Sequence, residues 1–263
     1  MVTIYSLSDK YEDKETLGNK GGNLVSMTRL GLPVPLGFIV SIESYRVFKQ
    51  SGALPNEDIE QAISALERQT KQKMGQGLQV SVRSSAPVSM PGMMDTLLNI
   101  GDRERVKQAI KRIFDSWDNP RAVEYRRINH IPPKLGTAAI VQAMVFGNKD
   151  SNSGTGVVFT RNPSTGKKGL FGEYLAQAQG EDIVSGTRTP EPILALKSQM
   201  PHIYDELDEL TKSLEHHYRD MQDVEFTVET GKLYILQTRS GKRSGQAAVK
   251  IAVDMTKEKI ITP

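Results

Sequence analysis

Apolar residues recur at helical spacing in three segments of the chain, residues 56–74, 102–117 and 201–221. Such spacing places an apolar stripe along one face of a helix. The sequence therefore predicts three amphipathic helices, with Asn56 and Asp102 as the N-caps of the first two. The apolar positions are Ile59, Ala62, Ile63 and Leu66; Val106, Ile110, Ile113 and Trp117; and Ile203, Leu207, Leu210 and Leu214.

Shorter apolar runs between these helices predict β-strands. They cover residues 78–83, 138–146, 156–160, 223–229 and 232–238. The last two are joined by Thr230-Gly231, a turn dipeptide that predicts a β-hairpin. Because strands and helices mix without strict alternation, we expect an α+β (mixed α/β) fold rather than a doubly wound parallel sheet.

Composition narrows the class of protein. The chain has 263 residues, of which 38% are hydrophobic and 25% charged, and a formal net charge of +3. The absence of cysteine excludes disulfides, thiolate metal sites and a catalytic thiol. With no basic block, no apolar run near 18 residues and no signal-peptide layout, we expect a cytoplasmic protein without nucleic-acid or membrane partners.

Two glycine-rich segments are candidates for phosphate binding. Residues 18–23, GNKGGN, place glycines around Lys20 just before an apolar run, where a helix start would add its dipole. Residues 151–156, SNSGTG, belong to an irregular stretch, 148–156, that we expect to be a mobile loop. Each segment could also be a plain turn. Walker-type phosphate loops and G-x-S-x-G elbows are absent, and the four histidines form no metal-binding pattern.

Arg83 ends a predicted strand whose alternate positions are apolar, and it precedes a loop rich in methionine, proline and glycine, SSAPVSMPGMMDT. A guanidinium near a core requires a partner or a wet cleft. A structural salt bridge and an anion-binding role both satisfy this requirement.

The predicted hairpin combines acidic and amide side chains. Asp223 and Glu225 share one face of the first strand, and Gln237 and Arg239 share one face of the second. A two-residue loop at Thr230-Gly231 would put Gln237 on the wrong face, since it pairs Glu225 with Leu236. A three-residue loop, or an equivalent bulge, pairs Glu225 with Gln237 and Asp223 with Arg239. That register would form an oxygen-rich Mg²⁺ pocket beside a cation for phosphate; the alternative is a solvated strand face.

Long strings of this sequence resemble the nucleotide-binding domain of pyruvate phosphate dikinase. They include GNKGGNLVSMTRLGLPVPLGFIVS, VSVRSSAPVSMPGMMDTLLNIG, NPRAVEYRRINHIP, GTAAIVQAMVFGNKDSNSGTGVVFTRNPSTG, FGEYLAQAQGEDIVSGTRTP and HHYRDMQDVEFTVETGKLYILQTRSGKRSGQAAVKIAVDM, in order, within residues 15–256. The resemblance implies an ATP-grasp-like fold in which two lobes hold Mg-ATP in a cleft between them. We expect lobes over residues 1–146 and 147–240, followed by a linker helix over 241–263.

The resemblance also implies roles for individual residues. Lys20 and Arg83 would contact the phosphates, and Arg239 would face the phosphate in transfer. Asp223, Glu225 and Gln237 would hold Mg²⁺. The remaining nucleotide contacts would be Gln142, Met144 and Val145 at the adenine, Gly154, Thr155 and Gly156 closing over the phosphates, and the cleft acids Glu173 and Glu181. Arg83, Arg239, Gln237 and Lys20 would be the catalytic set.

The implied reaction is the first half of the dikinase cycle, ATP + pyruvate + phosphate to AMP + phosphoenolpyruvate + pyrophosphate. In that half-reaction the pyrophosphoryl group of ATP moves to a histidine. Two departures from the family qualify it: one subdomain is lacking after residue 101, and the chain ends at Pro263, before the family's histidine and barrel domains. We therefore expect a histidine carrier in trans. The alternative is a non-catalytic nucleotide sensor or interaction module.

Overall fold

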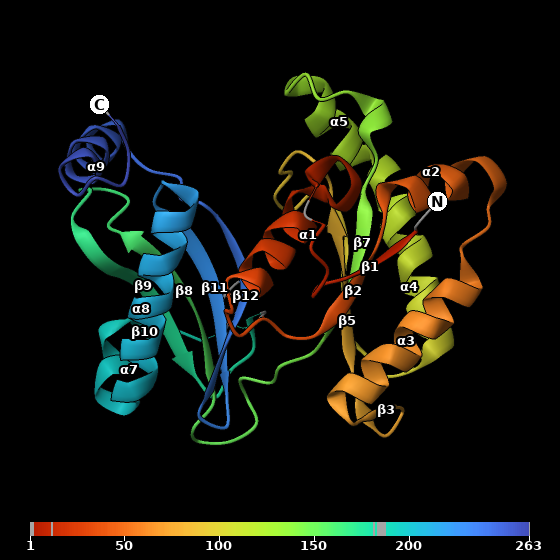
Figure 1. Ribbon diagram of the computed structural model, residues 1–263, viewed down its shortest axis with the longest axis horizontal. Coiled ribbons are helices and arrows are strands. Elements are labelled where there is room, and N and C mark those ends of the chain that lie inside the picture. Colours follow the sequence, from red (N-terminus) through yellow and green to blue (C-terminus); the bar gives the residue numbers. More distant parts are fainter. Residues whose placement is uncertain (1–2, 12, 181, 183–187, 263) are drawn as a thin grey trace. The chain divides into compact units, whose positions relative to one another are not determined.

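The structure is a computed structural model that describes residues 3–11, 13–180, 182 and 188–262 (Figure 1). Contacts divide the chain into two compact units, one of residues 1–31 and 35–144, the other of 32–34 and 145–263. Each unit combines helices with a five-stranded sheet whose neighbouring strands are antiparallel. The prediction of a mixed helix and sheet fold is therefore confirmed.

The first unit is a sheet with helices on both faces. Its strand order is β1 (Ile4–Ser6), β2 (Gly37–Val40), β7 (Ala138–Ala143), β5 (Val80–Ser85) and β6 (Thr96–Ile100). Helix α1 (Lys14–Arg29) packs on one face, where Gly21 lies against Ile39. Helices α3 (Asn56–Thr70) and α4 (Arg103–Asp115) cover the opposite face with a core that includes Ile63, Ile110 and Val82 (Figure 1). The unit also contains α2 (Ile42–Ser51), α5 (Pro120–Ile128), the 3-10 turns η1 (Ser116–Asp118) and η2 (Pro133–Leu135), and a small parallel pair, β3 (Lys73–Met74) and β4 (Gly77–Leu78).

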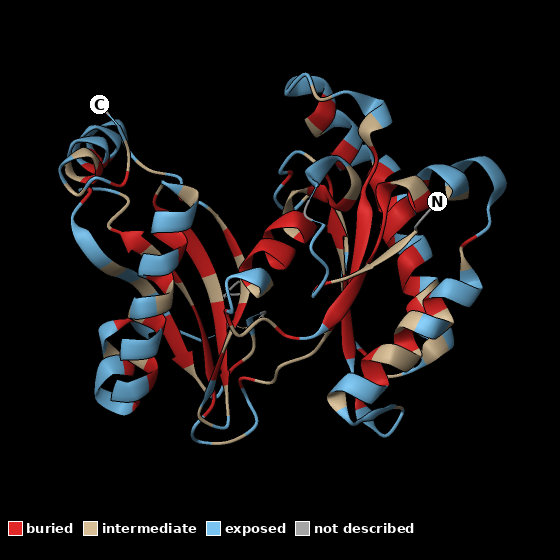
Figure 2. Ribbon diagram, in the orientation of Figure 1, coloured by how far each residue is buried: buried red, intermediate tan, exposed pale blue. Residues whose placement is uncertain are grey.

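The second unit is a sheet with its main helix on one face. Its order is β10 (Glu191–Pro192), β9 (Lys168–Ala176), β8 (Gly154–Arg161), β11 (Gln222–Glu229) and β12 (Lys232–Ser240). Helix α8 (Pro201–Tyr218) packs along β8, β11 and β12 (Figure 1). Val224, Phe226 and Val228 alternate toward the core, as their spacing predicts. Figure 2 shows this burial along the strands. The short α7 (Leu194–Gln199) precedes α8.

The three predicted helices and five predicted strands are present within a few residues of their expected limits. Asp102 caps α4, because its Oδ1 accepts the amide of Arg105 at 2.9 Å. The prediction of an Asn56 cap is wrong: Pro55 takes the cap position of α3, without a side-chain hydrogen bond, and Asn56 is the first helical residue. The boundary between the units, 144/145, lies two residues before the predicted one.

The last helix, α9 (Gly245–Lys257), lies in the segment predicted as a linker helix, and its contacts group it with the second unit. Ala247, Ile251 and Met255 meet Met221 in a small apolar cluster. A buried ion cluster fixes the helix end: Arg161, fully buried, binds Glu215 of α8 at 2.7 Å and Glu258, the C-cap of α9, at 2.9 Å.

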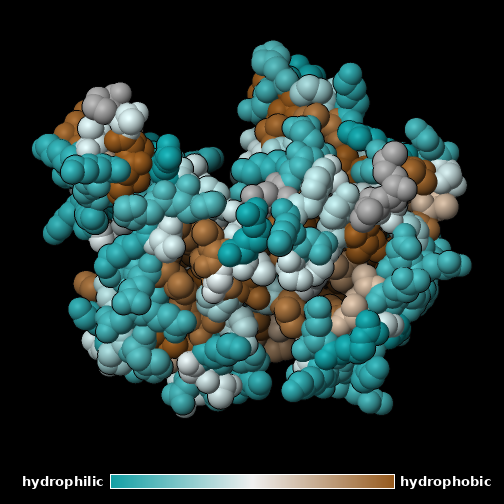
Figure 3. Space-filling view, in the orientation of Figure 1, coloured by the Kyte–Doolittle hydropathy of each residue, from teal (hydrophilic) through white to brown (hydrophobic). Residues whose placement is uncertain are grey.

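Some apolar side chains remain on the surface. Val249 and Val253 on the outer face of α9 are 68% and 47% exposed, and Ile128 on α5 is 61% exposed. Brown atoms appear at the positions of these two helices in Figure 3. Over the described part of the chain, every helix is too short or too polar to cross a membrane.

Candidate functional site

The hairpin of β11 and β12 has the register that the Mg²⁺ hypothesis requires. Thr230 and Gly231 have positive φ values of 51° and 72°, and Glu229 pairs with Lys232, so the loop itself has two residues. The register then shifts. Phe226 lies opposite Ile235, whereas Glu225 lies opposite Gln237, with Leu236 as the extra residue of a β-bulge. The predicted pairing is confirmed, and a bulge produces it.

The bulge brings two side-chain pairs together. Gln237 Nε2 donates to Glu225 Oε1 at 3.2 Å, and Arg239 Nε donates to Asp223 Oδ2 at 2.7 Å. The side chain of Asp223 is 8% exposed and that of Arg239 is 42% exposed. Among the described residues, the buried Oδ1 of Asp223 has no hydrogen-bond partner. A buried carboxylate oxygen without a donor is costly unless a ligand occupies it.

The same sheet face carries a third acid. Glu225 pairs with Val157 on β8, and Val157 pairs with Glu173 on β9. Glu173, Val157, Glu225 and Gln237 therefore form one row across four strands, with Val157 half-buried and Glu173 exposed. Because adjacent strands lie about 4.8 Å apart, Glu173 is roughly 10 Å from Glu225 along the row. The other predicted acid, Glu181, lies outside the described residues.

The predicted phosphate loop at residues 154–156 is a buried strand. Gly154, Thr155 and Gly156 open β8, and the prediction of a mobile loop there is wrong. The glycines have a packing reason: a Cβ on Gly154 would lie 2.4 Å from the hydroxyl of Tyr174, and one on Gly156 would lie 2.5 Å from the ring of Phe226. Their backbones pass beneath two stacked rings whose centroids are 6.4 Å apart. Thr155 donates its hydroxyl to Phe226 O at 3.0 Å, so that side chain is satisfied within the sheet.

The rest of the predicted mobile loop is held by Asp150. Its Oδ1 accepts the hydroxyl of Ser153 at 2.7 Å, and its Oδ2 accepts the hydroxyl of Thr230 at 2.7 Å. The hydrogen bond from Ser153, and then the one from Thr230, keep the pKa of the Asp150 carboxyl below its ordinary value. The loop is thereby tied to the hairpin turn that sets the register.

In the first unit, the GNKGGN segment is part of α1 and not a loop before a helix. The helix breaks at Gly18, whose φ of 72° and ψ of 168° are not helical, and Lys20 lies just after this break. Two amides of the new turn already have protein acceptors: Asn19 N–H donates to Ala86 O at 2.8 Å, and Gly21 N–H donates to Ser85 Oγ at 2.9 Å. The amides of Asn19 and Gly21 are therefore committed to the protein, and the predicted anion cradle of glycine amides is wrong at Gly21. The half-buried side chain of Lys20 is not affected by this correction.

Arg83 lies on β5, on the face that α1 covers. Its Nη2 donates to Oε1 of Gln142 on β7, and its register partners are Ile140 on β7 and Thr96 on β6. The prediction that Gln142 lines the adenine receives no support from its side chain. Gln142 is 2% exposed, and its Nε2 donates to Pro35 O at 2.8 Å.

Met144 and Val145, the other predicted adenine contacts, follow the end of β7 and do not lie within it. Both are half-buried. The amide of Met144 donates to Gln79 O at 2.9 Å and is therefore committed to the protein. Backbone recognition of a base at these residues would therefore depend on the two carbonyls and on the amide of Val145.

Sequence reasoning missed one anchoring residue, Asp95, in the loop between β5 and β6. Asp95 binds Arg112 of α4 at 3.0 Å and Arg121 of α5 at 2.9 Å. Arg121 also donates to Met93 O at 3.0 Å. These contacts fix the methionine-rich loop next to the Arg83–Thr96 pair. The alternating pattern of the chain gives no signal for them, since the partners are distant in sequence.

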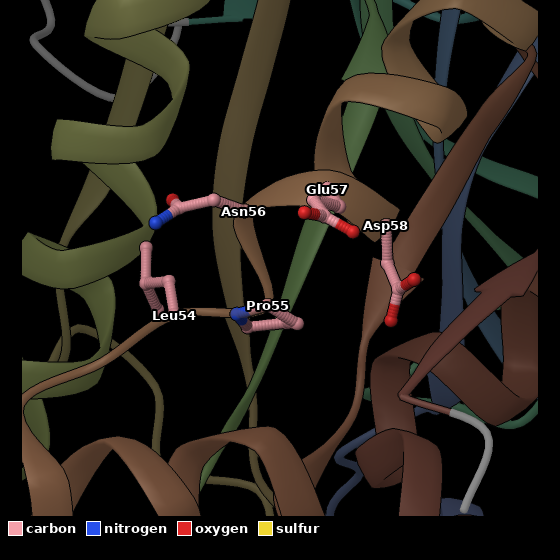
Figure 4. A pocket seen from close by; sticks show the side chains of 5 residues that line it. All are labelled: Leu54, Pro55, Asn56, Glu57 and Asp58. Atoms are coloured by element: carbon pink, nitrogen blue, oxygen red, sulfur yellow. The ribbon is translucent and has the colours of Figure 1, made fainter.

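A pocket of about 400 Å³ opens at the start of α3 and contains none of the predicted site residues (Figure 4). Leu54, Pro55, Asn56, Glu57 and Asp58 line it. Asp58 Oδ2 already accepts the hydroxyl of Thr3 at 2.7 Å. The two acids in this first turn disfavour an anion, so the pocket is a poor phosphate site.

Comparison with known proteins places these residues in context. A family model described as pyruvate phosphate dikinase, AMP/ATP-binding domain, matches residues 53–206 and 202–260. The pyruvate, phosphate dikinase of Clostridium symbiosum is 40% identical over 345 residues, which cover 95% of this chain and 40% of that protein. The chloroplastic enzyme of Mesembryanthemum crystallinum is 38% identical, covering 94% of this chain and 36% of its own length.

These figures show two differences in extent. The chain spans 40% or less of the length of these two relatives. The alignment with the Clostridium enzyme, at 345 residues, is longer than the 263-residue chain itself, so that relative has residues inside the aligned region that this chain lacks. Among solved structures, D-cycloserine synthetase DcsG gives a TM-score of 0.46 at 11% identity, covering 89% of this chain and 68% of that one.

Proposed function

The chain belongs to the family of the pyruvate phosphate dikinase AMP/ATP-binding domain, and on that premise we propose that it binds Mg-ATP and transfers its pyrophosphoryl group to a histidine of another domain or chain. The observation that carries the proposal is the bulge at Leu236. It sets Glu225 opposite Gln237 and Asp223 opposite Arg239. A regular two-residue hairpin would not produce this pairing.

The donor set suits Mg²⁺ as part of an Mg-ATP complex. Asp223, Glu225 and Gln237 offer hard oxygen ligands, and among the described residues the buried Oδ1 of Asp223 has no hydrogen-bond donor. Over the described residues, no group of three or more acids or histidines could hold a metal ion. Two carboxylates and an amide fit a cation that keeps water and phosphate oxygens as further ligands. When bound, Mg²⁺ would neutralise negative charge on the phosphate oxygens.

The protein's own cations have a complementary role. Arg239 is half-exposed, so its guanidinium reaches solvent while its Nε is bound to Asp223. We assign Arg239, Lys20 and Arg83 to the triphosphate, where fixed cations stabilise charge that develops during transfer. Glu173, on the row of Glu225, is assigned to the nucleoside end.

The proposed step conserves atoms without a redox change. A histidine nitrogen attacks the β-phosphorus of ATP, the bond from that phosphorus to the oxygen bridging it to the α-phosphate breaks, and AMP leaves with that oxygen. Phosphate would then accept the outer phosphoryl group, and the carrier would pass the inner one to pyruvate. The residues named here bind and orient the reactants, and they form no covalent intermediate.

Calorimetry with Mg-ATP tests nucleotide binding, which both the transfer hypothesis and the sensor hypothesis require. We expect binding at sub-millimolar nucleotide, and Arg239→Met should abolish pyrophosphoryl transfer. Arg243→Met is the matched control, because Arg243, three residues after the end of β12, also forms an ion pair, with Asp220 at 2.6 Å, and is assigned no ligand. Absence of binding at millimolar Mg-ATP would refute the proposal.

A second measurement distinguishes a chain that transfers the pyrophosphoryl group from one that only senses the nucleotide. A protein carrying the phosphorylatable histidine domain of a dikinase is added, and AMP release is followed. AMP that appears only with the histidine protein supports transfer. Binding without AMP release, under the same conditions, identifies a nucleotide sensor instead.

A further inference from the structure

Gln142 and Arg83 are diagonal neighbours on one face of the first unit's sheet. Gln142 pairs with Ser81 across β7 and β5, and Arg83, two residues along β5, pairs with Ile140. Positions two apart on a strand share a face, so both side chains lie on the face that α1 covers. The long side chains span the diagonal, and Arg83 Nη2 donates to Gln142 Oε1.

Both ends of the Gln142 amide are engaged. Its Nε2 donates to Pro35 O at 2.8 Å, while its Oε1 accepts from Arg83. Rotating the amide by half a turn would point an NH₂ group at the guanidinium and an oxygen at a carbonyl, so only one orientation is favourable. Because Gln142 is only 2% exposed, a lost partner would leave a buried polar group unsatisfied.

The backbone around Gln142 supports this orientation. Gly37 is its register partner on β2, and a Cβ there would lie 2.4 Å from Val141 O and 2.9 Å from Gln142 Cα. Only glycine permits this approach of β2 to β7. It also brings the Pro35 carbonyl, two residues earlier, within reach of the Gln142 amide.

We infer that Gln142 is a positioning residue that fixes the guanidinium of Arg83 for phosphate binding, rather than a contact to the adenine; the inference rests on the proposed function. The chemistry favours an amide for this role. A neutral oxygen orients the guanidinium through a hydrogen bond and leaves its positive charge for a polyanion. A carboxylate at position 142 would orient it equally well but would offset that charge. Arg161, which binds two glutamates and is fully buried, illustrates the contrasting structural use of arginine.

Two variants separate positioning from direct contact. Gln142→Met keeps the volume but removes the acceptor, and Ser81→Ala is the control, since Ser81 is its register neighbour and makes only a 3.5 Å contact with Gln142 O. We expect Gln142→Met to weaken Mg-ATP binding by about tenfold, with little effect on AMP, which lacks the outer phosphates. Ser81→Ala should change neither value by more than about twofold.

A double-mutant cycle identifies the route of the effect. In an Arg83→Met background, Gln142→Met should cause no further loss of Mg-ATP affinity, because its action passes through Arg83. Additive losses, or an equal loss for AMP and ATP, would overturn the inference and restore the adenine contact. Cooperative thermal unfolding confirms that each variant is folded.

A measurement without nucleotide keeps the inference separate from the proposed function. In protein labelled with ¹⁵N-arginine, the Nη signals of Arg83, assigned by their loss in Arg83→Met, report rotation about the guanidinium bonds. We expect slow rotation in the parent chain and in Ser81→Ala, and faster rotation in Gln142→Met. Unchanged rotation in Gln142→Met would refute the positioning role. Restricted rotation together with no Mg-ATP binding would leave Arg83 fixed but refute its phosphate role.

Discussion

The hydroxyl of Ser85 replaces one hydrogen bond of helix α1. It accepts the amide of Gly21 at 2.9 Å and donates to the carbonyl of Leu17 at 2.8 Å, the two groups that an unbroken helix would join directly. Gly18, at the break, could carry no side chain, because a Cβ would lie 1.9 Å from Ser85 O. Lys20 on α1 immediately precedes Gly21, whose amide binds the Ser85 hydroxyl, and Arg83 lies two residues before Ser85 on β5.

Ser85→Ala should destabilise the first unit by about 1–3 kcal/mol, because it leaves a buried amide and a buried carbonyl without a partner. Urea unfolding followed by circular dichroism measures the change. Ser84→Ala is the matched control, since Ser84 lies on the opposite face of β5, away from the helix break. Equal losses for the two variants would contradict the bridging role.

Glu225→Gln should weaken Mg-ATP binding by about tenfold or more while leaving metal-free ATP binding nearly unchanged, because a neutral amide is a poorer Mg²⁺ ligand. Calorimetry with and without EDTA measures both. Glu229→Gln is the control: Glu229 lies on the same strand face but binds Lys149 at 3.0 Å, beside the turn. A Glu229→Gln variant that is as defective as Glu225→Gln would remove the metal assignment.

Gly154→Ala should cost about 1–3 kcal/mol, since the added methyl overlaps the ring of Tyr174. Gly245→Ala is the control, because Gly245 starts α9 with open space around it. Thermal unfolding compares the two. If Gly154→Ala kept full stability but lost Mg-ATP binding, the glycine would serve the ligand and not the packing.

Tyr174→Phe should stabilise the second unit by roughly 1 kcal/mol, because the buried hydroxyl of Tyr174 has no hydrogen-bond partner among the described residues. Burial first, and then the charge of Glu191, raises the pKa of Tyr174 to about 12, so the group stays neutral at ordinary pH. Urea unfolding at neutral pH measures the gain. A loss of stability would show that the hydroxyl has a partner, such as water.

Glu258→Gln should lower stability at neutral pH by roughly 1 kcal/mol, and the difference from the parent chain should vanish in acid. Burial alone would raise the pKa of Glu258, but hydrogen bonds from Arg161 and Lys168 outweigh it and lower the pKa below its usual 4.5. The stabilisation is therefore complete above pH 4.5 and lost as the pH falls through the folded-state value. Urea unfolding from pH 7 to pH 3 measures it.

The control for this pH dependence is Glu206→Gln, an exposed glutamate on α8. It should shift stability only slightly at any pH. A Glu258→Gln deficit that persisted unchanged at pH 3 would show that charge is not the source of the effect.

Periodicity located the elements with strong local patterns. Helices α3, α4 and α8 and strands β5, β7, β8, β11 and β12 carry apolar spacing that only one backbone conformation can bury. Strands β1, β2, β6 and β9 and helices α2 and α5 were not predicted, although α2 carries local limits in its Ser41 N-cap and its Gly52 C-cap. The break in α1 at Gly18 depends on Ser85, more than sixty residues away.

By itself, the sequence determined the mixed fold, the family and the residue types available for a polyanion, since those follow from local patterns and from long matching strings. Tertiary structure alone decided how they are used. The folded chain contains a bulge that pairs Glu225 with Gln237, and two aromatic rings pack against Gly154 and Gly156. A glycine or an acid at a given position specifies what is sterically or electrostatically permitted, and the neighbours brought by folding determine which permitted use is realised.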